Sequence, residues 1–379
     1  MIEYNPRSWF DTICRWRGSV VPEVLPHMLQ TGLVAMLVWY LDAHGVNCHI
    51  EKTGHSMFGF FVTFLVIFRV NNAVHGFARG EQLLEEFHET ACEIMRHCMP
   101  KARGATVVPL LRRQVLQTAG LMIMHLRDEN VLDGLQHLRE AKLLTEKEAS
   151  VLEAVVRRER FPSRRSRDFS TVALTLITAE LWRHENEGTL ASDMRKSIDS
   201  CVSTLHHITH ATDSIKCGQI PFQYVQMQRL FMVIFLYTVP CALVQSLRAT
   251  TIPVTMILTF GYVGLDKTGD SLEDPFGDDL ADLPLVSMLR KMETSTRRIV
   301  DARFGAGVAE AFDFSPLKPD AGDDGEPDLL DGDVNGNGNG LMGGMTAGFK
   351  SSAVVQEGGY QPIAGGGGSD LLGLGSNEA

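Results

Sequence analysis

The chain has 379 residues, of which 44% are hydrophobic, so it is long enough for one large or two ordinary domains with a substantial core. Its net charge of −11 is concentrated in residues 313–379, which hold 11 acidic and 2 basic side chains and leave the rest of the chain nearly neutral. No basic stripe with interleaved aromatic residues occurs, which argues against nucleic-acid binding, and the seven cysteines form no C-x-x-C pair, which is typical of reduced thiols.

The N-terminal segment, residues 1–19, lacks the apolar core and cleavage site of a secretory signal, so we do not expect one. Four later stretches lack Asp, Glu, Lys and Arg, with 18, 16, 18 and 17 residues: 24–41, 53–68, 230–247 and 249–265. As helices they reach about 24–27 Å, slightly less than a hydrocarbon core of about 30 Å. Buried helices of a soluble protein are the alternative. The arrangement as two pairs around a long charged section favours four transmembrane helices, at about 24–41, 53–78, 222–247 and 249–266.

Basic residues beside the first two spans predict their orientation. Three arginines precede the first span, and Arg69 and Arg79 lie at the end of the second, whereas the loop between the spans has only Lys52. Because basic loops remain in the cytosol or its equivalent compartment, we expect both termini on that side.

Between the two pairs of spans, residues 80–218 show apolar side chains at helical spacing, as do residues 283–304. Both segments predict a cytosolic helical domain, with breaks at Pro100, Gly104, Gly134, Pro162 and Gly188. The membrane and cytosolic parts together make one domain of residues 1–310.

The C-terminal tail, residues 313–379, contains 17 of the 35 glycines and most of the net charge. Such a composition buries too little apolar surface to offset the entropy of ordering, so the tail is predicted to be disordered. Its binding partner, if it has one, is not indicated by the sequence.

The second span carries Phe60, Phe64 and Phe68 at positions i, i+4 and i+8, which share one face of a helix. In a single chain, such a stripe is most often a packed seam. Around a symmetry axis, however, it would form three rings of phenyl groups. The positive edges of those rings tolerate an anion better than a cation, and a narrow apolar ring can close a pore by dewetting.

Several phrases resemble the bestrophin family of anion channels. They are W-R-G-S at 16–19, F-R-V-N at 68–71, I-P-F-Q-Y at 220–224, P-C-A-L-V at 240–244, E-D-P-F-G at 273–277 and D-L-P-L at 282–285. The resemblance implies an all-α membrane protein that forms a homopentamer, with four transmembrane helices and a cytosolic helical domain in each subunit. It also implies that Phe60, Phe64 and Phe68 form the pore neck and that Ile220 lines the cytosolic aperture. The phrases after residue 273 are most similar to bacterial and plant-type members.

These expectations define a passive channel, with no enzyme activity, for chloride and other small anions such as bicarbonate or nitrate. The alternative function is a non-conducting membrane scaffold that recruits partners through its acidic tail. The protein is expected to be a multi-pass integral membrane protein of a plastid thylakoid or a plasma membrane.

This function requires no cofactor, but the family resemblance implies that a calcium site could be present. Animal bestrophins hold calcium in an acidic clasp after the P-F-G turn, and Asp279 and Asp282 match acidic positions of that clasp. Carboxylate oxygens are suitable calcium ligands. Leu280 and Ala281 interrupt the acidic run, and Asp282 acting as a helix cap is the alternative interpretation.

Two other patterns in the sequence resemble metal-binding motifs. Residues 278–282 fit D-D-x-x-D, a magnesium-diphosphate motif of isoprenoid synthases, but Pro284 follows at once and no second such motif exists in the chain. His206, His207 and His210 have the spacing of metal ligands on a helix, without a glutamate between them or an identifiable third ligand. We set the magnesium motif aside and interpret the histidines as hydrated or pore-facing side chains.

Overall fold

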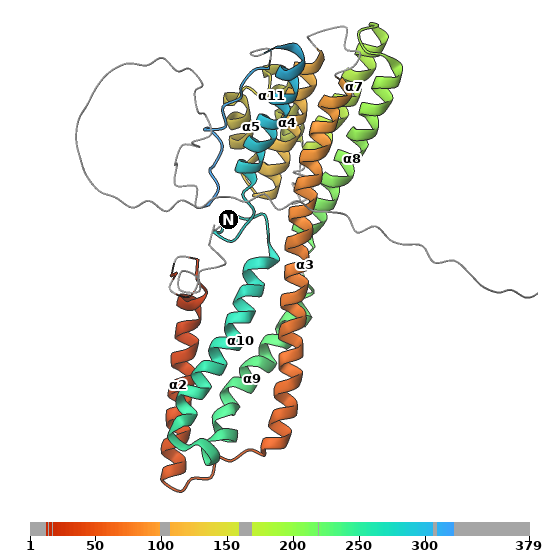
Figure 1. Cartoon of the computed structure of the whole chain (residues 1–379). Helices are drawn as coiled ribbons and strands as arrows, with labels where there is room; N and C mark the ends of the chain where they lie inside the picture. The colour runs from red at the N-terminus through yellow and green to blue at the C-terminus, as the bar shows by residue number, and fades with distance from the viewer. Residues whose placement is uncertain are drawn as a thin grey trace, which may run out of the picture. The chain divides into compact units, whose positions relative to one another are not determined.

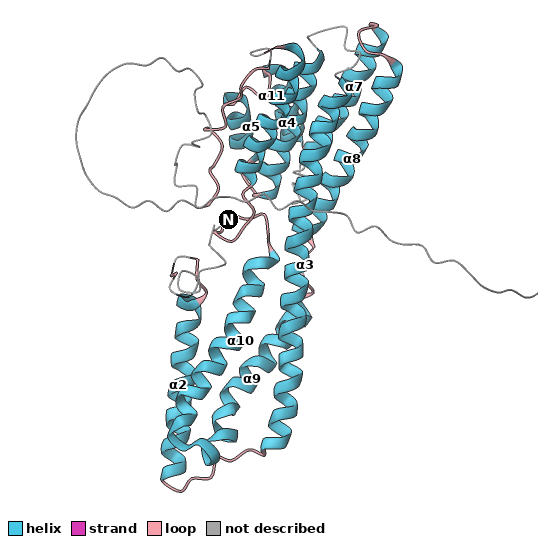
Figure 2. Cartoon of the chain, in the orientation of Figure 1, coloured by secondary structure: helices cyan, strands magenta, loops and turns pink. Residues whose placement is uncertain are grey.

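The computed structural model describes residues 13, 15–16, 18–98, 107–158, 169–218, 220–305 and 309–321. The chain divides into two compact units, Met1–Glu326 and Pro327–Ala379, and all described residues belong to the first. Within the described ranges the regular elements are helices and no strand occurs (Figure 2), as expected for an all-α protein. The helices are α2 (Val21–Ala43), α3 (Lys52–Cys98), α4 (Val107–Leu126), α5 (Val131–Glu140), α6 (Glu146–Arg158), α7 (Ser170–Asn186), α8 (Ser192–Cys217), α9 (Phe222–Leu247), α10 (Thr251–Glu273) and α11 (Leu285–Phe304).

Three helical stretches are long and apolar enough to cross a membrane: Val21–Ala43, Lys52–Cys98 and Phe222–Glu273. The third stretch comprises α9 and α10, which are separated by a short 3₁₀ turn, Arg248–Thr250. Arg248 has a φ of 49° and a ψ of −125°, which lie outside the helical conformation and end α9. The four predicted spans therefore correspond to four separate helices, except that the fourth was predicted to begin two residues early, in the 3₁₀ turn, and α3 and α10 extend well beyond the apolar segments.

The four apolar segments form one group of helices, in which α2, α9, α10 and the first half of α3 pack together (Figure 1). Their small common core is made of Val24, Val62, Val66, Met232, Phe235, Leu236, Val239 and Val263. Many other apolar side chains point outward, among them Leu33, Phe60 and Ile257. A large exposed apolar surface of this kind requires a covering of lipid or of other protein subunits.

Two glycines allow the helices of this group to approach closely. A Cβ atom at Gly59 on α3 would lie 2.7 Å from the Phe235 ring of α9, and one at Gly32 on α2 would lie 3.1 Å from the Met256 sulfur of α10. Small residues at helix contacts are a common feature of membrane proteins, because lipid-exposed helices associate through close packing.

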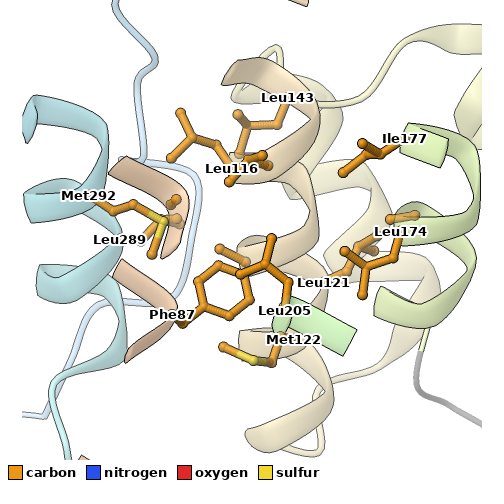
Figure 3. Close-up of a cluster of buried hydrophobic side chains, with 14 of the residues drawn as sticks. Phe87, Leu116, Leu121, Met122, Leu143, Leu174, Ile177, Leu205, Leu289 and Met292 are labelled. Atoms are coloured by element: carbon orange, nitrogen blue, oxygen red, sulfur yellow. The ribbon is translucent and has the colours of Figure 1, made fainter. Parts of the chain in front are cut away.

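The helical domain forms around the second half of α3 and includes α4, α5, α7, α8 and α11 (Figure 1). Its larger core contains Phe87 from α3, Leu116 and Leu121 from α4, Leu205 from α8 and Leu289 from α11 (Figure 3). The helix α3 runs without a break from the group of four apolar helices, called the membrane group below, into this core.

One predicted helix break is wrong. Gly134 lies inside α5 and is buried, and a Cβ atom there would lie within 2.2 Å of the Met124 side chain of α4. The glycine is needed for close helix packing rather than for a turn. Gly188, by contrast, follows α7 with a φ of 70°, as expected for a helix end. The breaks predicted at Pro100, Gly104 and Pro162 lie outside the described residues.

After α11 the described residues 309–321 pack back onto the helical domain, although the tail was predicted to begin at 313. Phe314 and Leu317 are buried in the larger core. The Asp320 carboxylate accepts hydrogen bonds from the backbone N–H groups of Val286 and Ser287, at 3.0 and 2.8 Å, in the first turn of α11. Residues 322–379, the rest of the predicted disordered tail, lie outside the described residues.

Candidate functional site

The three phenylalanines predicted for the pore neck lie on one face of α3. Their side chains are exposed in the single chain, by 79% for Phe60, 59% for Phe64 and 47% for Phe68. The rings of Phe64 and Phe68 stack with centroids 6.3 Å apart, and Tyr224 of α9 meets Phe68 edge to face at 5.8 Å. The stripe is therefore not a packed seam within the subunit, and its rings are free to line a surface that another copy or lipid covers.

After the phenylalanines, toward the C-terminal end of α3, the same face of the helix becomes polar. Asn71, His75 and Arg79 follow Phe68 at spacings of three, four and four residues, and all three are outside the buried core. Arg79 lies 3.8 Å from Glu86 in a surface ion pair. From the sequence, Arg79 was interpreted only as a sign of membrane orientation. Extending the i, i+4 pattern beyond the apolar segment would have found this polar continuation.

Ile220, predicted for the cytosolic aperture, lies directly before α9 and is half-buried. Pro221 follows as the N-cap residue of α9. One turn later, the hydroxyl of Tyr224 donates a hydrogen bond of 2.7 Å to the backbone carbonyl of Leu65. The segment that carries Ile220 is thus attached to α3 in the region of the phenylalanine stripe.

A buried ion cluster next to the stripe was missed by the sequence analysis. Arg69 is 2% exposed and donates hydrogen bonds to Asp266 and Asp270 at 2.5 Å and to Glu273 at 3.0 Å. Gln228 of α9, fully buried, donates to Asp266 at 3.0 Å. The cluster joins α3, α9 and α10 immediately after Phe68, so it holds the Phe68 end of the stripe in place.

The acids of this cluster carry a recognisable signal. They stand at i, i+4 and i+7 on α10, which places them on one face of a helix. The predicted span ended at 266 because charged residues begin there, but α10 continues to Glu273. Charges on one helix face at the end of an apolar segment indicate a buried partner, here Arg69.

The acidic loop between α10 and α11 was the candidate calcium site. Asp282 is buried, and its Oδ2 accepts a hydrogen bond of 2.6 Å from the backbone N–H of Asp279. Its Oδ1 has no partner among the described residues. Burial raises the pKa of Asp282 to about 6; the hydrogen bond from Asp279 opposes this shift, and the negative charges of neighbouring aspartates add to it.

The described side chains do not by themselves form a calcium site. Calcium takes about six to eight oxygen ligands. No group of three or more Asp, Glu, His or Cys side chains in the described ranges is placed to hold a metal ion. Asp278 is instead paired with Arg127 and Lys318. The calcium ligands Asp279 and Asp282 stay a prediction, and no step of conduction is assigned to calcium.

Asp282 does not cap α11. The N-cap residue is Pro284, and Asp320 supplies the carboxylate that accepts hydrogen bonds from the first turn. The three acids of the D-D-x-x-D pattern lie in a loop rather than on a helix face, as Pro284 predicted. His206, His207 and His210 are exposed on α8.

Comparison with known proteins assigns this arrangement to a family. A family model described as a bacterial/fungal bestrophin protein matches residues 1–298. The voltage-dependent anion channel-forming protein sll1024 of Synechocystis is 23% identical over 299 residues, which cover 78% of this chain and 93% of that protein. The voltage-dependent anion channel-forming protein YneE of Escherichia coli K12 is 22% identical over 307 residues, which cover 79% of this chain and 94% of that protein.

The fold is similar to solved structures as well. A crystal structure of a bacterial bestrophin homologue from Klebsiella pneumoniae superposes with a TM-score of 0.64 at 18% identity, covering 73% of this chain and 98% of the other. With long apolar helices in its described part and this family match, the chain is an integral membrane protein. It belongs to the bestrophin family, as the phrases in its sequence predicted.

Proposed function

We propose that the protein is a passive anion channel that conducts chloride, and also other small anions such as bicarbonate or nitrate. The observation that carries the proposal is the row of exposed phenylalanines, Phe60, Phe64 and Phe68, on the face of α3 that continues as Asn71, His75 and Arg79. The names of the Synechocystis and Escherichia coli relatives, which call them anion channel-forming proteins, support it.

The conducting unit in this proposal is a homopentamer with four transmembrane helices in each subunit, α2, α3, α9 and α10. Five copies of α3 around one axis convert the three phenylalanines into three stacked rings. The ring edges are the positive part of the aromatic quadrupole and favour an anion over a cation. When the neck narrows, water leaves the apolar rings and conduction stops without a charged gate.

On the helical-domain side of the neck, the anion meets a polar surface. Asn71 supplies amide N–H donors and Arg79 a permanent positive charge, which offset part of the cost of removing water from the ion. The cation attracts chloride and repels sodium or potassium. Ile220 then restricts the size of what leaves through the cytosolic aperture.

Reconstitution tests this proposal. Purified protein in liposomes loaded with chloride should release the anion when an electrical shunt such as valinomycin and potassium is supplied, and should exclude cations. Native mass spectrometry of the same preparation should give five subunits. Intact membrane insertion without anion release would contradict the channel and favour the non-conducting scaffold, for which deletion of residues 322–379 would remove partner binding.

A further inference from the structure

A cavity of about 230 Å³ lies between α2, α9 and α10, inside the membrane group of a single subunit. It extends along α9 from Arg229 to Tyr237. Eight residues of α-helix correspond to about 12 Å. That depth is most of one leaflet of the hydrocarbon core, about 15 Å. The volume is several times that of one water molecule, about 30 Å³.

The two buried threonines that line the cavity have their hydroxyls already hydrogen-bonded. Thr31 and Thr259 are buried, and their hydroxyls bond to each other at 2.8 Å. The backbone carbonyls of His27 and Thr255 accept further hydrogen bonds from these hydroxyls, at 3.1 and 2.9 Å. Met232, Leu236 and Val263 supply an apolar wall, and His27 and Tyr237 also line the cavity. Such a surface suits a hydrocarbon chain and disfavours water.

The mouth of the cavity is charged. Arg229 and Lys267 line it and are 44% and 33% exposed at their side chains. Arg229 is hydrogen-bonded to Asp270 at 2.6 Å. The Lys267 ammonium lies 3.6 Å from Glu23 and 3.8 Å from Asp270, which is farther than a hydrogen bond. Its donors are therefore available to a further oxygen ligand.

These two ends fit one class of ligand. We propose that the cavity binds a glycerophospholipid of the leaflet next to the helical domain, with its phosphate at Arg229 and Lys267 and one acyl chain along α9 toward Tyr237. The charged mouth lies at the end of α10 that leads to the helical domain, which is the level of the lipid headgroups, and the apolar wall lies at the level of the chains. Acids near the mouth balance its cations, so the phosphate diester, rather than the net charge of the lipid, is the recognised group.

Binding of this lipid would connect the bilayer to the buried ion cluster. Asp266 lines the cavity and is also the partner of Arg69 and Gln228. The site does not depend on the proposed conduction, because it lies within one subunit and is built from residues outside the phenylalanine stripe.

Native mass spectrometry of the purified full-length protein tests the site with defined lipids. The probes are dioleoylphosphatidylglycerol, dioleoylphosphatidylethanolamine, and a galactosyl diacylglycerol that lacks phosphate. We expect one firmly retained phospholipid per subunit with either headgroup, and weak retention of the galactolipid. Inorganic phosphate alone should not displace the phospholipid, which separates a lipid site from a simple anion site.

Matched variants decide whether the cavity is the site. Val233 lines the cavity, and Val233→Trp should reduce phospholipid retention about tenfold by filling it. Leu230→Trp is the control, since it places the same side chain one turn earlier on α9, at an exposed residue outside the cavity. Lys267→Gln should weaken retention of both phospholipids about fivefold and leave the galactolipid unaffected. Equal retention by Val233→Trp and Leu230→Trp, or no retained lipid in any protein, would overturn the proposal.

Discussion

The hydroxyl of Tyr224 donates a hydrogen bond of 2.7 Å to the backbone carbonyl of Leu65, which joins the first turn of α9 to α3 between Phe64 and Phe68. This bond connects the two parts of the pore that the sequence predicted separately, the phenylalanine neck and the aperture at Ile220. Since the accepting carbonyl already belongs to a helix, the bond adds specificity of position rather than secondary structure.

Removing this hydroxyl tests the connection. Tyr224→Phe keeps the ring that meets Phe68 but loses the hydrogen bond, so we expect the free energy of unfolding to fall by about 1 kcal/mol. Thermal unfolding in detergent measures this loss. Single-channel recording should show altered gating at unchanged selectivity. Tyr237→Phe, also on α9 but with a weaker 3.3 Å contact to Gln30, is the control and should have little effect.

The neck assignment predicts a gating defect in Phe64→Ala. Removing the middle phenyl group widens the proposed apolar ring, so water remains in it and the current should be poorly gated. Planar-bilayer recording measures open probability and conductance. Leu33→Ala removes an outward-facing apolar side chain of α2 and should leave both quantities unchanged. Unchanged conductance and gating in Phe64→Ala would remove the neck assignment.

Much of the membrane part could be predicted from the sequence because its signals are local. Uncharged runs such as 24–41 and 249–265 locate α2 and α10, and the i, i+4, i+8 spacing places Phe60, Phe64 and Phe68 on one face. What the spacing leaves open is whether that face is buried or exposed. The structure shows it exposed, and the axis that five copies would share stays a prediction.

The contacts that the sequence could not predict join residues far apart in the chain. Arg69 and Asp266 are separated by 197 positions, and Arg127 and Asp320 by 193. Nothing in a local window indicates which acid will meet which arginine. The helix break predicted at Gly134 was wrong for a related reason. In a sequence, a glycine that allows close helix packing cannot be told from a glycine that ends a helix.

The Arg69 cluster predicts a large loss of stability in Arg69→Met. The change leaves the buried Asp266 with Gln228 at 3.0 Å and the half-exposed Arg229 at 3.3 Å, and breaking a buried ion pair costs up to about 3–5 kcal/mol. The midpoint temperature of thermal unfolding should fall accordingly. The double variant Arg69→Met with Asp266→Asn should recover part of the loss, since the orphaned charge is then absent. An additive double variant would show that the two groups do not interact.

The contacts of Glu148 lead us to expect a free energy of unfolding that depends on pH. It accepts hydrogen bonds from Arg113 at 2.8 and 2.9 Å and forms a capping box with Thr145 at the start of α6. Burial raises the pKa of Glu148, but the hydrogen bonds from Arg113 and Thr145 and the charge of Arg113 together lower it by more, so the pKa lies below its usual 4.5.

Because the folded-state pKa is lowered, the stabilisation is fully present above pH 4.5 and is lost as the pH falls through the lower folded-state value. Glu148→Gln should therefore reduce the free energy of unfolding by about 1–2 kcal/mol at pH 7, with a difference that shrinks below pH 4.5. Glu153→Gln is the control on the same helix. Its pair with Arg157 is a surface contact of 3.6 Å and should contribute less than about 0.5 kcal/mol.

Chelation of calcium should leave anion flux unchanged. The acidic loop gathers no set of three metal-binding side chains in the described ranges, Asp278 is held by Arg127 and Lys318, and burial raises the pKa of Asp282 to about 6. A calcium ion would have to gather most of its oxygens from the backbone. Liposome flux with EGTA and with millimolar calcium measures the dependence. A flux that EGTA abolishes, that calcium restores, and that Asp282→Asn makes insensitive to both would instead establish the loop as a calcium site. Asp282 is the residue to change because its Oδ1 is a buried side-chain oxygen without a hydrogen-bond partner among the described residues.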